Sequence, residues 1–162
     1  MPTSDGRETR WVAVVRADGL DRLSGAGSVM RRVLRQPLPA GFAPEPFSLD
    51  SGPFGAFSRS RPLSDDGRIV AVETPGHAPG HVSVICVDDV GDHVMLAGDA
   101  TDTLEQLHAL RADAIAPDPK AHVATLETIL THCALHPTVY LPSHDPESVA
   151  RLAGAVTVDV NG

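Results

Sequence analysis

The sequence predicts an α/β fold in which helices pack as a layer against a β-sheet, the arrangement also described as layered α+β. Short apolar runs rich in Val and Ile recur over residues 68–97, each bounded by Gly, Pro or Asp. A helical pattern follows over 119–135, and strand-like and helix-like segments alternate without internal repeats. With 162 residues and 42% hydrophobic content, the chain is expected to form a single domain over residues 1–162.

The first 62 residues carry the weaker patterns. Residues 1–10 are polar and expected to fray, 11–15 (WVAVV) predict a strand, and 20–36 predict one or two helical pieces weakened by Gly25 and Gly27. Residues 37–62 hold all four phenylalanines but no clear periodicity. They predict either a lid whose aromatic rings line an acyl pocket or a long loop anchored by those rings, and the anchored loop is favoured.

The middle of the chain predicts three strands. After the Asp-Asp-Gly turn at 65–67, residues 68–74 alternate like a strand. Residues 81–87 and 93–97 predict two more, and the DDVGD segment between them is typical of a hairpin turn.

The last third predicts a helix, a strand, a second helix and a final strand. Asp118 and Pro119 form a helix-starting pair, and the helix should run to Leu135. Residues 138–141 predict a strand, Asp145 should cap a helix beginning at Pro146, and 155–160 predict the last strand. The long helix should bury one apolar face and carry three histidines at its surface or end: the face comprises Val123, Leu126, Ile129, Leu130 and Cys133, and the histidines are His122, His132 and His136.

Charge and cysteine content narrow the class of protein. The formal net charge is −8, and ten of the thirteen basic residues lie before residue 69, so the remainder is strongly acidic. An acidic surround suits cation binding and argues against a nucleic-acid partner, although a merely solvated acidic surface is an equal alternative. The two isolated cysteines, with no long apolar run, predict reduced thiols in a cytoplasmic protein without a membrane segment.

Ligand-type side chains fall where predicted strands begin or end. His81 opens one apolar segment, Asp99 closes the next, and His144 follows the strand at 138–141. Imidazole nitrogen and carboxylate oxygen are good ligands for zinc and similar divalent ions. His77 precedes His81 by four residues, but Pro75, Gly76, Pro79 and Gly80 exclude a helix there, so the pair belongs to a loop. Taken alone, each of these residues has a purely structural role as the alternative to metal binding; for Asp99 that role is to cap a turn.

The three blocks TPGHAPGH, AGD and PSHD, in that order, resemble the C-terminal half of the metallo-β-lactamase superfamily of metal-dependent hydrolases. GDATDTLEQL with PSHDPES is most similar to the N-acyl homoserine lactone lactonase-like branch. The resemblance implies half of an αββα sandwich, with His81 on one metal, His144 on a second, and Asp99 both bridging them and acting catalytically. His77 would lie beside the ligands without binding metal directly.

Two departures from the family accompany this resemblance. The upstream His-x-His-x-Asp-His block, which supplies further ligands, does not occur, because all eight histidines lie at or after position 77. The domain is therefore expected to be N-terminally incomplete and its metal site truncated. Asp102 stands where the lactonases usually carry a substrate-contacting tyrosine, and no substrate-binding residue is predicted.

Three functions remain open on the sequence. The chain is either a metallo-hydrolase of small-molecule esters or lactones, with one or two divalent ions, zinc expected, or a non-catalytic truncated member that keeps partial metal binding. The third is an interaction module whose His and Asp satisfy loop hydrogen bonds. Half of a sandwich would expose an apolar sheet face, which favours a homo-oligomer.

Overall fold

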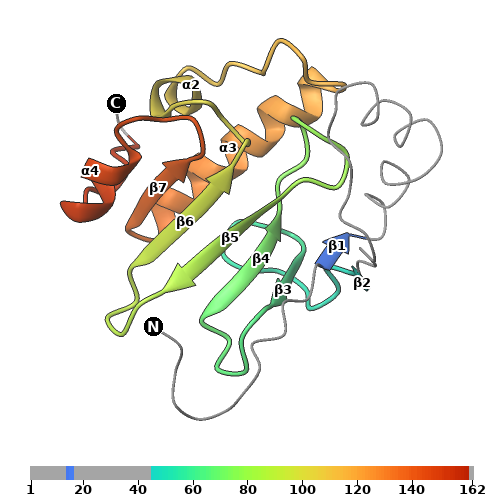
Figure 1. Cartoon of the computed structure of the whole chain (residues 1–162), viewed down its shortest axis with the longest axis vertical. Coiled ribbons are helices and arrows are strands. Elements are labelled where there is room, and N and C mark those ends of the chain that lie inside the picture. The colour runs from blue at the N-terminus through green and yellow to red at the C-terminus, as the bar shows by residue number, and fades with distance from the viewer. Residues whose placement is uncertain (1–13, 17–44, 161–162) are drawn as a thin grey trace, which may run out of the picture. The chain divides into compact units, whose positions relative to one another are not determined.

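The computed structural model describes residues 14–16 and 45–160 (Figure 1). The chain divides into two units, and the boundary between them in the sequence falls between Phe47 and Ser48. In the first unit, β1 (Val14–Arg16) pairs in parallel with β2 (Glu45–Phe47). β1 overlaps the strand predicted at 11–15, whereas the helical pieces predicted at 20–36 and the fraying predicted for 1–10 lie outside the described residues. The prediction of one domain over 1–162 stays a prediction.

The second unit is built on a mixed five-stranded sheet. Its strands are β3 (Ser60–Pro62), β4 (Ile69–Glu73), β5 (Val82–Val87), β6 (His93–Gly98) and β7 (Thr138–Pro142), in that spatial order. The first four pair antiparallel, and β6 pairs in parallel with β7. The predicted hairpin between β5 and β6 is confirmed, and Asp88 closes it by accepting the backbone N–H groups of Val90 and Asp92.

Helices complete the unit and confirm the predicted α/β class. α2 (Leu104–His108) and α3 (Pro119–Leu135) connect β6 to β7, and α4 (Ser148–Ala153) follows β7. α3 has the predicted bounds because Pro119 occupies its first turn and the Asp118 carboxylate accepts the N–H groups of Lys120 and Ala121. None of the described helices is long and apolar enough to cross a membrane.

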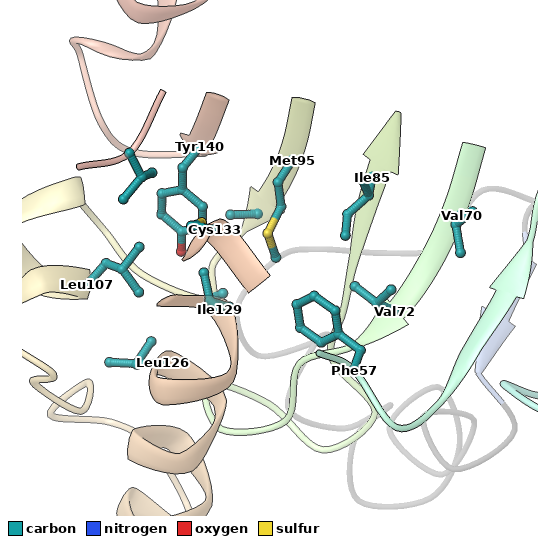
Figure 2. Close-up of a cluster of buried hydrophobic side chains, with 13 residues drawn as sticks. Phe57, Val70, Val72, Ile85, Met95, Leu107, Leu126, Ile129, Cys133 and Tyr140 are labelled. Carbon is teal, nitrogen blue, oxygen red and sulfur yellow. The ribbon is translucent and has the colours of Figure 1, made fainter. Parts of the chain in front are cut away.

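The core lies between α3 and one face of the sheet. Figure 2 shows the buried side chains of β4, β5 and β6 directed at those of α3, with Phe57 beside them. Successive side chains of a strand point to opposite faces of the sheet. Those that point to the core face include Val70, Val72, Ile85 and Met95, and each is at most 2% exposed. Phe57 is in the core and Phe54 packs against it, as expected of a loop anchored by its aromatic rings.

The prediction that His122 and His132 lie at the helix surface is wrong, because both are fully buried. They occupy the α3 face that also carries Leu126, Ile129 and Cys133, and His132 lies among the rings of Phe54, Phe57, His93 and His136. Val123, predicted on the buried face, is only half-buried. His136 ends the helix as its C-cap, as predicted.

Two further predictions near the C-terminus need correction. Residues 155–160 do not form a strand: the Val158 N–H donates to the Thr138 carbonyl and its side chain joins the core, but Val156 is 55% exposed. The last helix begins at Ser148 instead of Pro146, because Asp145 first closes a turn by accepting the Glu147 N–H. The short helix α2 was not predicted, since five residues are too few to show helical periodicity.

Candidate metal-dependent active site

Every predicted site residue lies at one edge of the five-stranded sheet, where strands β6 and β7 end. β6 and β7 are parallel, so Asp99 and His144, which follow their ends, lie at the same edge. β5 runs antiparallel to β6, so His81, which precedes its start, lies there too. A hydrogen bond from Ser143 N–H to the Gly98 carbonyl ties the ends of β6 and β7 together. We call this edge the site edge.

A chain of hydrogen bonds fixes the ring of His81. The Ala97 carbonyl accepts the Ser83 hydroxyl at 3.0 Å, so the Thr74 hydroxyl must donate to Ser83 Oγ, also at 3.0 Å. Thr74 Oγ1 then accepts from His81 Nδ1 at 2.9 Å, and the Thr74 carbonyl lies 3.0 Å from the same nitrogen. The proton of His81 is therefore on Nδ1, so Nε2 is the ring nitrogen that can accept a hydrogen bond or bind an ion.

The His81 lone pair faces the start of the loop after β6. The Asp99 N–H donates to His81 Nε2 at 3.3 Å, so in this structure the lone pair accepts a backbone hydrogen bond. Gly98 has a positive φ of +61°, and a Cβ there would lie 3.2 Å from His81 Nε2, so glycine permits both the turn and the close approach. Burial lowers the pKa of His81 below its ordinary value and keeps the ring neutral, as a metal ligand requires.

The carboxylate of Asp99 lies between two histidines. Its Oδ1 is 3.4 Å from His144 Nε2, and its Oδ2 is 3.7 Å from His77 Nε2. The His144 side chain is 67% exposed and that of Asp99 39%, so solvent and small molecules reach both groups. The structure therefore brings together Asp99, His144 and His77, with the His81 ring against the backbone of Asp99.

Two residues that sequence reasoning did not identify support this arrangement. Asp113 Oδ2 lies 2.8 Å from His77 Nδ1. His122 Nε2 donates to the Ala100 carbonyl at 2.7 Å, and its Nδ1 accepts the Asp113 N–H at 3.0 Å. No sequence signal marks either residue, because Asp113 lies 36 positions from His77 and His122 sits within an ordinary helical pattern.

The donor set fits a divalent ion in chemistry but is incomplete in number. His81 Nε2, His144 Nε2 and the Asp99 carboxylate are the ligand types that zinc prefers, and His81 has the required tautomer. Among the residues that the structure describes, however, no three His, Cys, Asp or Glu side chains converge closely enough to hold an ion. The residues present fit part of a metal site.

Comparison with known proteins confirms the resemblance at the level of the fold. No family model matches the chain. Over 90 residues it is 27% identical to the N-acyl homoserine lactonase AttM of Rhizobium radiobacter, an alignment that covers 56% of this chain and 34% of that protein. The chain therefore spans about a third of the length of this curated relative.

Solved structures share the fold over more of the chain. An N-acyl homoserine lactone hydrolase with N-hexanoyl-L-homoserine at its catalytic metal centre aligns with a TM-score of 0.61 and 17% identity, covering 85% of this chain and 48% of the hydrolase. A B. thuringiensis AiiA variant with N-decanoyl-L-homoserine at its active site gives the same values. The hydrolase AbOPH of the beta lactamase superfamily aligns at 0.55 and 15%, with the same coverage.

These likenesses establish that the chain has the α/β fold of metallo-β-lactamase-like hydrolases. At 15–17% identity they establish the fold alone. The chain spans about half the length of these structures, in agreement with the incomplete sandwich that the sequence predicts.

Proposed function

We propose that this chain provides part of the active site of a metal-dependent hydrolase that acts on small-molecule esters or lactones. The observation that carries the proposal is the site edge, where the Asp99 carboxylate lies between His77 and His144 and the Nε2 lone pair of His81 faces the same loop. The relatives that are named lactone hydrolases support the choice of substrate class.

The residues of the site edge would have different roles in the reaction, according to their chemistry. A bound divalent ion, with zinc expected, would supply an acidified water and polarise a carbonyl oxygen. His81 and His144 would hold the ion through neutral imidazole nitrogens. Asp99 would be the carboxylate ligand and would accept a proton from the water that attacks the substrate.

The incomplete donor set defines a second candidate function. Because the described residues do not form a closed metal group, the chain is alternatively a non-catalytic member that keeps partial metal binding or acts through oligomerisation. Leu96 and Ile69 favour this reading: they alternate with core residues on β6 and β4 and are 49% and 41% exposed. Exposed apolar side chains on one sheet face are typical of an interaction surface.

The experiment that tests the proposal is metal content per chain, measured by elemental analysis, together with ester and lactone hydrolysis before and after chelation. We expect about one or two ions per chain and hydrolysis that chelation abolishes. His81→Ala should lose metal, whereas His108→Ala, which removes a histidine of α2 that is not a proposed ligand, should not. Thermal unfolding of both variants verifies that they are folded.

The outcomes separate the two functions. Metal-dependent turnover that is lost in His81→Ala supports the hydrolase. Bound metal without turnover, or a stable oligomer that is indifferent to chelation, supports the non-catalytic member. Equal metal content in wild type and His81→Ala contradicts the assignment of His81 as a ligand.

A further inference from the structure

In the loop between α2 and α3, the carboxylate of Asp113 is held in a fixed position against His77. The backbone carbonyl of Asp113 accepts the Ala116 N–H at 3.1 Å, and its Oδ1 accepts the Ile115 N–H at 3.2 Å. Oδ2 is then the oxygen left for the histidine, and it lies 2.8 Å from His77 Nδ1. The Asp113 side chain is 17% exposed, so water competes little for this bond.

His122 connects this loop to the residues of the site edge. Its ring is fully buried and both nitrogens are bonded, Nε2–H to the carbonyl of Ala100 and Nδ1 to the Asp113 N–H. Ala100 is adjacent to Asp99. The backbone of Gly76, which precedes His77, also lies on His122: a Cβ at Gly76 would be 2.7 Å from His122 Cα. One buried side chain therefore sets the relative positions of the loops that carry Asp99, His77 and Asp113.

The bond to Asp113 determines which nitrogen of His77 faces Asp99. Hydrogen bonding to His77 lowers the pKa of Asp113, which keeps it an ionised carboxylate that can only accept. The shared proton is therefore on His77 Nδ1, and a neutral ring presents the Nε2 lone pair toward Asp99 Oδ2, 3.7 Å away. A lone pair facing a carboxylate is favourable only where a proton or a cation lies between them.

We infer that Asp113 is a positioning residue of the site: it orients His77 and fixes its Nδ1–H tautomer so that Nε2 joins Asp99 and His144 as an acceptor at the site edge. The inference rests on the proposed function for its catalytic meaning, but the tautomer itself does not depend on turnover. His77 would then contribute an acceptor nitrogen to the site, in addition to lying beside the ligands.

The test is a long-range ¹H–¹⁵N spectrum of the histidine rings, which distinguishes Nδ1–H from Nε2–H, recorded well above the usual histidine pKa of about 6.5. We expect His77 to be Nδ1–H in the wild-type protein. In Asp113→Ala it should move to the Nε2–H form that an unconstrained histidine prefers. In Asp113→Asn, which keeps the size of the side chain, the amide can donate as well as accept, so the two tautomers should mix.

Asp118→Asn is the matched control, because it removes one carboxylate from the same loop while asparagine still caps α3. It should leave His77 as Nδ1–H. An Nε2–H form in the wild-type protein, or an unchanged tautomer in both folded Asp113 variants, would overturn the inference. Ester hydrolysis, measured on the same proteins, reports separately on the proposed function: a wild-type protein with the expected tautomer and no turnover contradicts only that function.

Discussion

At the scale of single residues, the backbone of Gly55 lies directly against the ring of His132. Gly55 has a φ of +54°, and a Cβ there would lie 2.2 Å from His132 Nδ1 and 2.4 Å from Cε1. The His132 ring cannot retreat, because it stacks near Phe54 and Phe57 and its Nε2 lies 2.9 Å from His93 Nδ1. The backbone therefore covers His132 Nδ1, which has no hydrogen-bond partner in the described part of the chain.

Replacing Gly55 with alanine should destabilise the fold by roughly 2–4 kcal/mol, since overpacking adds to the cost of a positive φ. Gly52→Ala is the control: φ there is +86°, but no atom lies within 4 Å of the added Cβ, so only the backbone cost of roughly 1 kcal/mol is expected. Urea unfolding of the two variants measures the difference. Equal losses would show that the His132 contact relaxes without cost.

At the scale of elements, the start of α3 depends on one side chain. The Asp118 carboxylate accepts two of the N–H groups that the first turn leaves unpaired. Asp118→Ala should therefore lower the free energy of unfolding by about 1 kcal/mol, and Asp118→Asn should stay near wild type. Chemical denaturation measures both, and similar losses in the two variants would contradict a capping role.

Arg151 and Asp145 join three elements at the end of β7. Arg151 of α4 donates to the Tyr140 carbonyl of β7 and to Asp145 Oδ2, each at 3.0 Å. The same oxygen accepts the N–H of Leu104, where α2 begins. Burial opposes ionisation of Asp145, but the hydrogen bonds from Glu147 and Arg151 outweigh it, and the net result is a lowered pKa.

Arg151→Ala should destabilise the protein by about 3–5 kcal/mol, because it leaves a buried carboxylate without its partner. Arg111→Ala removes an exposed arginine and should change stability by less than about 0.5 kcal/mol. Thermal unfolding compares them. A small loss for Arg151→Ala would mean that Asp145 recruits water or another donor. Because His144 is adjacent to Asp145, the same variant should also weaken metal binding if the proposed function holds.

The elements show which features a sequence can predict. The bounds of α3 followed from Asp118 and Pro119, because a cap is a local signal. Alternation over 155–160 predicted a strand wrongly, because apolar alternation does not provide a neighbouring strand to pair with. The site edge was foreseeable for His81, Asp99 and His144, which flank strands, but Asp113 was not, because its partner is distant in sequence.

At the scale of the whole molecule, buried histidines couple stability to pH. Burial, with nearby His93 and His136, lowers the pKa of His132 to about 4 from its ordinary value of 6.5. Burial also lowers the pKa values of His81 and His93. In this range the unfolded chain binds more protons than the folded chain, so stability must rise with pH.

Stability should therefore be complete above about pH 6.5 and fall as the pH decreases toward about 4. This window lies above the one for Asp66, Asp88, Asp113 and Asp145: their pKa values are lowered below 3.8, so their contribution is lost only at more acidic pH. Urea unfolding at a series of pH values measures both windows separately.

His132→Phe identifies the histidine responsible. The substitution keeps a ring among Phe54, Phe57 and His93 but removes the group that titrates, so the fall in stability between pH 6.5 and 4 should become shallower even if the variant is less stable at neutral pH. His108→Ala, which removes a histidine outside this cluster, should retain the wild-type slope. If His132→Phe and wild type lose stability in parallel, the acid sensitivity belongs to His81 and His93. His132 would then stabilise the fold through its packing against Gly55 without contributing to the pH dependence.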